Sequence, residues 1–342
     1  MPLSRALLLV GLARAEAGSA ACWVCAPDTW TPLSQPVHPN VQRGRKFSAE
    51  IILSHCRFRI RWLASARAEL SSCGFETRAI TVYTKCGKLD VGAPAGAKVI
   101  CSPNRGRNDE AYARHLATGE QGFADVVLFL KDSLIGGSSA EFRKLRVGFC
   151  DLARAAVKRG FACGRRPIPS STPGGRSDFH DSALLAGFQM PVYATTHDQA
   201  RGTPTVPFNA TVRPLAAWLR AVDERVSRRI LSSRILPVCY GGTFSAARAR
   251  IAAVPPTVWR RFADGLSRGD NVEESHFMER LWGALFAPEL GDESAEQIWR
   301  AARLRDPAYW LRGNLDGCEC EDDTRRANSS FADGPSESAS PT

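Results

Sequence analysis

The sequence predicts an α/β fold: a mostly parallel sheet covered by helices on both faces, with a long irregular insertion and a C-terminal helical segment. From Ser48 onward, short apolar segments typical of strands alternate with segments at helical spacing. The strand segments are apolar at every position, which is typical of strands buried on both faces. The chain has 342 residues, 44% of them hydrophobic, and is therefore long enough to bury a full core.

The alternating pattern occupies the first half of the chain. The expected strands cover residues 49–54, 79–83, 98–101 and 125–130, and the expected helices cover residues 60–70, 109–117 and 143–159. The segment DVVLFL at 125–130 is the most hydrophobic of the strands. Asp109 and Glu110 fall in the first turn of their helix, where the helix dipole favours negative charge.

The second half of the chain is less regular. Residues 164–214 are rich in Pro, Gly, Ser and Thr, and form either an insertion on the sheet domain or an active-site flap. A helix is expected at 215–232. Residues 235–286 contain a strand, a Gly-Gly turn, a short helix, a helix that begins with proline, and an aromatic-rich E-R-L-W helix. A helix at 294–305 and a polar, disordered tail at 316–342 complete the prediction.

The N-terminus has the layout of a secretory signal peptide at residues 1–20. Arg5 precedes an apolar run, and small residues at 18–20 suit cleavage. The alternative is an extension that stays attached. An irregular segment at 21–47 and one α/β domain at 48–315 are expected to follow.

Eleven cysteines support the secretory route, because such a route would make several of them disulfides. The odd count leaves at least one free or intermolecular. Cys22-x-x-Cys25 is expected to be a structural disulfide rather than a metal site, and Asn209 and Asn328 begin glycosylation sequons. We therefore expect the Golgi lumen or the extracellular space. No segment approaches the roughly 20 apolar residues that span a bilayer, so no transmembrane span is expected.

The net charge of +10 comes mostly from scattered arginines, without a zinc-finger, RNA-recognition or basic-zipper pattern. The sequence therefore does not predict a nucleic-acid partner. It also contains no nucleophile elbow, P-loop or Rossmann glycine fingerprint, which argues against hydrolase, NTPase and dehydrogenase functions.

Ligands of open α/β sheets bind beyond the carboxyl ends of the strands, so the loops that follow the four strands are the candidate site. Asn104, Arg105, Gly106 and Arg107 open a helix there. Backbone N–H groups and two guanidinium groups at this position suit a diphosphate. The alternative is a capped helix start with solvated arginines.

Asp132 follows the central strand, directly after Lys131. This is a usual place for a metal or ribose ligand, and the alternative is an aspartate that forms a turn. Tyr240-Gly241-Gly242 allows a close backbone approach to a ligand or to a strand.

The helix that contains E-R-L-W has two faces. Phe277, Leu281 and Leu285 fall at helical spacing and form its buried stripe. His276 and Glu279 share the opposite face, where they suit a general base and its orienting partner. The alternatives are a surface pair, or an ion pair of Glu279 with an arginine of the preceding helix. His180-Asp181 and His197-Asp198 lack metal-ligand spacing, and we expect them at the surface.

Several phrases resemble, in this order, an uncharacterised family of fungi, algae and bacteria, domain-of-unknown-function family 3431. They are IILSHC with RFRI and Trp62-Leu63, residues 82–87 (VYTKCG), residues 104–108 (NRGRN) with 112–115, residues 129–131 (FLK), and the module from Gly242 to Trp282. The resemblance covers roughly residues 48–150 and 230–287. That family is in turn similar to nucleotide-sugar-dependent glycosyltransferases of the GT-A type.

This similarity implies transfer of a sugar from a nucleotide-diphosphate donor to a glycan or another hydroxyl acceptor. Arg105 and Arg107 would then hold phosphate, Asp132 would hold Mn²⁺, Mg²⁺ or ribose, and Glu279 would serve as the base. The chain departs from the family pattern, because Asp132 is a single acid where a D-x-D pair is usual and Lys131 precedes it. A lysine can neutralise a diphosphate without metal. The same departures suit a second hypothesis, a non-catalytic domain that binds nucleotide or glycan without turnover.

Overall fold

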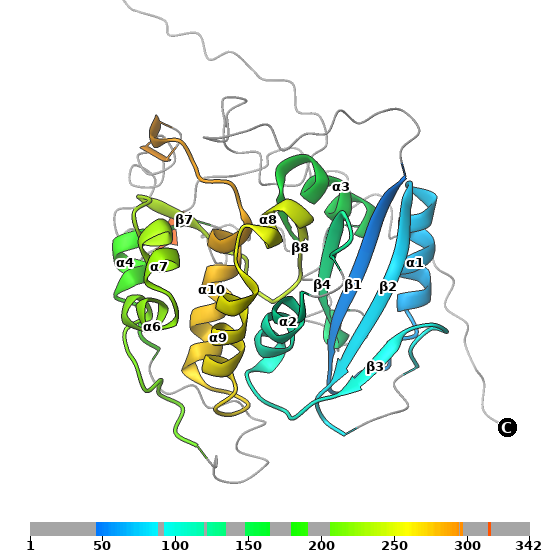
Figure 1. The fold of residues 1–342 in the computed structure, drawn as a ribbon, viewed down its shortest axis with the longest axis horizontal. Helices are drawn as coiled ribbons and strands as arrows, with labels where there is room; N and C mark the ends of the chain where they lie inside the picture. Colours follow the sequence, from blue (N-terminus) through cyan, green and yellow to red (C-terminus); the bar gives the residue numbers. More distant parts are fainter. Residues whose placement is uncertain are drawn as a thin grey trace, which may run out of the picture. The chain divides into compact units, whose positions relative to one another are not determined.

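The computed structural model describes residues 46–87, 92–119, 122–134, 148–164, 179–190, 206–293, 295–296 and 314–315, all within one compact unit, Ala21–Glu319 (Figure 1). The predicted signal peptide, the Cys22–Cys25 pair, the Asn328 sequon, the His197-Asp198 pair and the polar tail lie outside these residues.

The larger of the two sheets has six strands in the order β3-β2-β1-β4-β8-β5, and Figure 1 labels all of them except β5. Its strands are β1 (Phe47–His55), β2 (Phe75–Thr84), β3 (Lys98–Cys101), β4 (Val126–Lys131), β5 (Phe161–Cys163) and β8 (Phe244–Ala247). The pairs among β1, β2, β3 and β4 are parallel, and β8 is antiparallel to both β4 and β5. The predicted mostly parallel sheet is therefore confirmed. The antiparallel strand β8 was not predicted, because its FSAA segment is short and contains two alanines.

Helices cover both faces of this sheet, because alternate residues of its strands enter two different cores. In β4, Val127 and Phe129 pack with α2 (Arg107–Thr118), α9 (Pro256–Leu266) and α10 (Glu273–Phe286). Val126, Leu128 and Leu130 pack with α1 (Leu63–Ser72) and α3 (Phe149–Arg159) on the other face. Two buried faces explain why these strands are apolar at every position.

The remaining elements add a small second sheet and short helices. They are the antiparallel strands β6 (Phe179–Asp181), β7 (Ile235–Pro237) and β9 (Asn314–Leu315), the helices α4 (Ser182–Ala186), α6 (Leu215–Val222), α7 (Glu224–Leu231) and α8 (Arg248–Ala252), and the 3-10 turn η1 (Asp132–Leu134). Strand β6 and helix α4 lie within residues 164–214, so that segment is not irregular throughout. The helix expected at 215–232 is two helices, because Asp223 is extended and its carboxylate caps α7 at the N–H of Val226.

Three disulfides connect the described elements, so the prediction of several disulfides is confirmed. Cys56–Cys86 joins the ends of β1 and β2, Cys73–Cys150 joins the end of α1 to α3, and Cys163–Cys239 joins β5 to the segment after β7. Disulfides are typical of oxidising compartments, so these three are compatible with a secreted or lumenal protein. Among the described helices, none has the length and apolar character needed to cross a membrane.

Candidate functional site

The carboxyl ends of β1, β2, β3 and β4 lie at one edge of the sheet, because the strands are parallel and in register. From β1 the chain continues through α1 to β2 on one side, whereas α2 carries it back from β3 to β4 on the other side of β1. The point between β1 and β4 is therefore the topological switch point, the usual ligand site of an open α/β sheet. We call this edge of the sheet, together with the loops that follow its strands, the carboxyl edge.

Asp132 connects the two loops at the switch point. Its Oδ2 atom accepts hydrogen bonds from the backbone N–H groups of Cys56, Arg57 and Phe58, at 2.9, 2.6 and 3.0 Å. The side chain is buried, and it holds the loop after β1 against the end of β4. Asp132 was predicted to bind a metal ion or a ribose. One of its two carboxylate oxygens instead accepts the hydrogen bonds that fix the backbone.

Lys85, directly after β2, fixes the loop that leads into α2. Its Nζ donates to the carbonyl oxygens of Arg105 and Arg107 and forms an ion pair with Glu110 Oε2 at 3.0 Å. Both side chains of the ion pair are almost fully buried. Burial lowers the pKa of Lys85, and the neighbouring Glu110 carboxylate opposes this shift. The lysine therefore sets the path of the loop that carries the two candidate arginines.

The segment from Asn104 to Gly106 is also held by α9 and the residues after it. Asn104 Nδ2 donates to Asp270 Oδ2 at 2.7 Å, and Gly106 N–H donates to the carbonyl of Gly269 at 2.6 Å. Gly106 has a φ of 55°, and a Cβ there would lie 2.5 Å from the Leu266 carbonyl oxygen. Only glycine fits this conformation and this close approach. The backbone N–H of Gly106, one of the groups predicted to bind phosphate, is therefore already hydrogen-bonded to Gly269. The Arg105 side chain is exposed to solvent.

Arg107 lies at the centre of the carboxyl edge. It has a φ of 52°, the left-handed region that a residue other than glycine rarely adopts and that stores backbone strain. Its Nη1 lies 3.4 Å from His276 Nδ1, and His276 Nε2 lies 3.3 Å from Asn271 Oδ1. The two candidate elements, the start of α2 and the polar residues of α10, are therefore in direct contact.

Glu279 of α10 is buried beside Arg107. Its Oε1 accepts a hydrogen bond of 2.9 Å from the N–H of Gly241. Burial raises the pKa of Glu279, but the charges of Arg107 and Arg280, the Gly241 hydrogen bond and His276 outweigh it and lower the pKa to about 2. The side chain is thus a firmly held carboxylate of low basicity. The surface-pair interpretation of His276 and Glu279 is wrong, because both side chains are buried.

Asp109, in the first turn of α2, is a second buried carboxyl group of this cluster. Its Oδ1 accepts a 2.6 Å hydrogen bond from Trp282 Nε1. Burial raises its pKa to about 7, and the Glu279 carboxylate adds to the rise, whereas Arg107, the Trp282 hydrogen bond and Lys85 oppose it. Two carboxyl groups with widely different pKa values therefore flank Arg107.

Tyr112 joins this cluster to the end of β4. Its hydroxyl group lies 2.6 Å from the Leu130 carbonyl oxygen and 2.9 Å from that of Gly242. The charges of Asp109 and Asp132 both raise the pKa of this tyrosine, after the larger effect of burial. Lys131 is half-buried at the same edge.

Aromatic and histidine side chains flank the cluster on the α10 side. The guanidinium of Arg280 lies 3.9 Å from the ring centre of Phe188 and 5.3 Å from that of Tyr240. The hydroxyl of Tyr240 lies 2.9 Å from His180 Nε2. His180 and Asp181 are buried, and Asp181 caps α4, so the expectation that they lie at the surface is wrong.

Sequence reasoning missed Lys85, Asp109 and Tyr112 as site residues. Lys85 follows a predicted strand at the carboxyl edge, and this position is the signal that points to it. Asp109 is a polar residue in the first turn of a helix, which usually indicates solvent and a favourable dipole. Its burial depends on α10, which begins more than 160 residues later, so no local pattern reveals it.

The chain matches no known protein family and no curated protein. Among solved structures it is similar to a mycobacterial protein at 16% identity, with a TM-score of 0.28. The match covers 68% of this chain and 60% of the other, so the chain spans less than two thirds of that protein's length. A similarity this weak carries no argument about fold or function.

Proposed function

We propose that this protein is a glycosyltransferase-like enzyme that binds a nucleotide-diphosphate sugar at the carboxyl edge and transfers the sugar to a hydroxyl acceptor. The observation that carries this proposal is the contact between Arg107 and the polar residues of α10, His276 and Glu279, beside the switch point of a parallel sheet. The order of motifs in the sequence supports the same assignment.

The diphosphate is assigned to arginine. Arg105 is exposed, and Arg107 is half-buried with its backbone fixed by Lys85. Guanidinium groups bind phosphate oxygens through paired N–H donors. A pre-positioned arginine loses less side-chain freedom on binding, which favours affinity.

The residues present do not fit a divalent cation well. Mg²⁺ and Mn²⁺ prefer several oxygen ligands, whereas Oδ2 of Asp132 is occupied by three backbone N–H groups. Within the described part of the chain, no group of three histidine, cysteine or acidic residues is arranged to hold a metal ion. We therefore propose no step through Mn²⁺ or Mg²⁺.

In transfer, the acceptor oxygen forms a bond to the anomeric carbon as the bond to the diphosphate breaks, and the hydroxyl proton passes to a base. Glu279 was the base predicted from the sequence. With a pKa of about 2 it is a weak base, and its contacts suit it to orient Arg107. In this scheme Nδ1 of His276 takes the proton once Arg107, which contacts that atom in the free protein, has turned to the diphosphate, and Glu279 is a positioning residue.

Two of these observations favour a second function, the binding of a nucleotide or a glycan without turnover. The low basicity of Glu279 and the capping role of Asp132 both remove groups that catalysis would use. This alternative keeps the same ligand-binding edge and the same role for Arg107.

Two measurements on the intact, disulfide-bonded protein separate these functions. Calorimetric titration with UDP, GDP and CDP sugars measures binding, and release or transfer of radiolabelled sugar measures turnover. Arg107→Gln is expected to weaken donor binding at least tenfold, while the exposed Arg260→Gln on α9 leaves it unchanged. Binding without turnover favours the second function. If no nucleotide sugar binds, the transferase function and the nucleotide-binding form of the second function are both wrong.

A further inference from the structure

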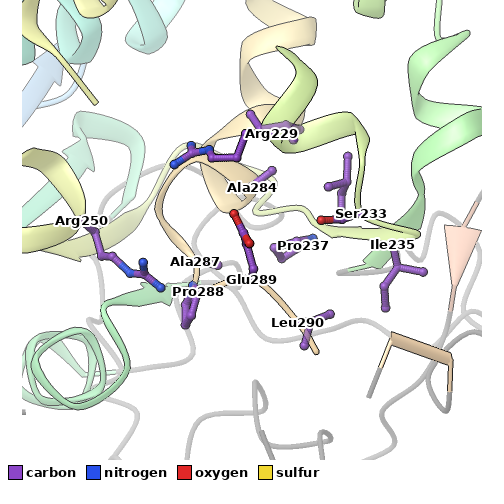
Figure 2. A pocket seen from close by; sticks show the side chains of 12 residues that line it. Arg229, Ser233, Ile235, Pro237, Arg250, Ala284, Ala287, Pro288, Glu289 and Leu290 are labelled. Carbon is purple, nitrogen blue, oxygen red and sulfur yellow. The ribbon is translucent and has the colours of Figure 1, made fainter. Parts of the chain in front are cut away.

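A second polar site lies away from the carboxyl edge. A cavity of about 100 Å³ opens between α7, β7, α8, the last turn of α10 and the segment after it (Figure 2). Its lining residues include Arg229 of α7, Arg250 of α8 and Glu289, which follows α10. In Figure 2 the Arg229 side chain runs above Glu289, and the Arg250 side chain extends toward it from the left.

Few groups of the protein accept hydrogen bonds from the guanidinium groups of Arg229 and Arg250. Arg229 uses one donor, from Nη2 to the carbonyl of Leu285 at 3.4 Å. The stem of Arg250 packs over Gly160, where a Cβ would lie 2.9 Å from Nε. Across the described residues, the guanidinium of Arg250 has no hydrogen-bond partner and no ion pair within 4 Å. Each guanidinium carries five donors, so most of them remain for another acceptor.

The charges at the cavity favour an anion. Burial lowers the pKa of Arg229 and of Arg250, and the positive charge of Arg229 lowers that of Arg250 further. Glu289 opposes both shifts, but it is exposed and supplies one negative charge against two positive ones. An oxyanion placed between the guanidinium groups would relieve their repulsion.

Polar atoms form most of the cavity surface and apolar side chains form the rest, so the walls suit an anion that also carries a small apolar part. The apolar part of the wall includes Ile230, Ile235, Leu236, Ala287 and Leu290, and Ser233 adds a hydroxyl group. A bare inorganic ion would leave these side chains in contact with water. A volume of about 100 Å³ exceeds by several-fold what one water molecule needs, and it suits a small charged group with a few carbon atoms.

We propose that this cavity binds a small organic anion, with a carboxylate or phosphate group held by Arg229 and Arg250 and a short apolar body against the aliphatic wall. The site is separate from the carboxyl edge. Glu279 and Ala287 are eight residues apart on and just beyond α10, which corresponds to about 12 Å along the helix. The two sites therefore do not share lining residues.

The test is titration of the intact protein with four probes, acetate, butyrate, inorganic phosphate and phenyl phosphate, followed by calorimetry or ligand-observed NMR. Butyrate is expected to bind more tightly than acetate, and phenyl phosphate more tightly than phosphate. The stronger of the two families identifies the anionic group. Equal affinity within both families would overturn the apolar part of the site.

Variants test the charged part. Arg250→Gln and Arg229→Gln are each expected to weaken binding at least tenfold, and Glu289→Gln is expected to tighten it several-fold because a competing carboxylate is lost. Arg228→Gln, exposed on the same helix as Arg229, is the matched control. Glu289 is exposed, so its variant is expected to fold as the wild type does. Unchanged affinity in Arg250→Gln, or weaker binding in Glu289→Gln, would overturn the proposal.

Discussion

Replacing Asp132 tests whether this side chain holds the switch point together. Its Oδ2 accepts three backbone N–H groups, and in Asp132→Ala all three lose their acceptor. A hydrogen bond to a charged group contributes about 1.5–3 kcal/mol, and the three share one oxygen, so their contributions do not add fully. Water reaches part of the exposed loop in the variant. We expect the free energy of unfolding to fall by about 3 kcal/mol.

The assay is urea unfolding of the oxidised protein with Asp132→Ala and Asp132→Asn. Asparagine keeps an acceptor oxygen but not the charge, so its cost is expected to be about half that of alanine. Asp264→Ala on α9 is the control, because its side chain is exposed, and it should change stability by less than about 0.5 kcal/mol.

Hydrogen exchange gives a local measure of the same change. The amides of Cys56, Arg57 and Phe58 should exchange faster in Asp132→Ala, although the Cys56–Cys86 disulfide still holds the start of the loop. A cost equal to that of the Asp264 control, with unchanged exchange, would refute the capping role. So would a loss of stability that appears only when Mn²⁺ is present.

Three further predictions concern the buried groups around Arg107. The pKa of Glu279 is lowered to about 2, so its negative charge stabilises the fold fully above pH 4.5 and progressively less as the pH falls toward 2. Glu279→Gln should therefore lower the free energy of unfolding by about 3 kcal/mol at pH 7 and by little near pH 2, as measured by urea unfolding. The pKa of Asp109 is raised to about 7, so keeping this group in the fold lowers the stability of the wild type increasingly as the pH rises from 4 to 7. Over that range the free energy of unfolding of Asp109→Asn should rise relative to the wild type by up to about 4 kcal/mol, and a difference that does not change with pH would contradict this. A Cβ at Gly242 would overlap the Asn108 side chain, whereas a Cβ at Gly241 would have no atom within 4 Å. Gly242→Ala should therefore destabilise the protein by at least about 1 kcal/mol more than Gly241→Ala. Thermal unfolding of the two variants checks this, and equal losses of stability would argue against the close approach.

The sheet could be predicted from the sequence because its strands are apolar at every position. The strand expected at 98–101 matches β3, and the other three parallel strands differ only at their ends. The antiparallel position of β8 could not be predicted, because strand order depends on contacts between distant segments. The helix break at Asp223 has a local signal, an aspartate that caps the next helix, which periodicity alone does not detect.

The candidate site was predicted in part. The position of Arg107 and Asp132 at the carboxyl edge followed from the order of the strands, whereas Glu279 was predicted only as part of the polar face of its helix. Their partners did not follow, because Glu279 meets Gly241 and Asp132 meets the loop after β1 only in the folded chain. A polar face opposite an apolar stripe usually faces solvent, whereas α10 is buried on both faces. Helical spacing identifies faces but not what covers them.

The most direct test of the carboxyl edge as the ligand site is hydrogen exchange of the intact protein with and without a saturating nucleotide sugar. Ligand binding at this edge should slow exchange at residues 102–107 and 240–243, and Arg107→Gln should raise the ligand concentration needed for this protection at least tenfold. Protection confined to the cavity near Arg229 and Arg250, or no protection at all, would contradict the assignment.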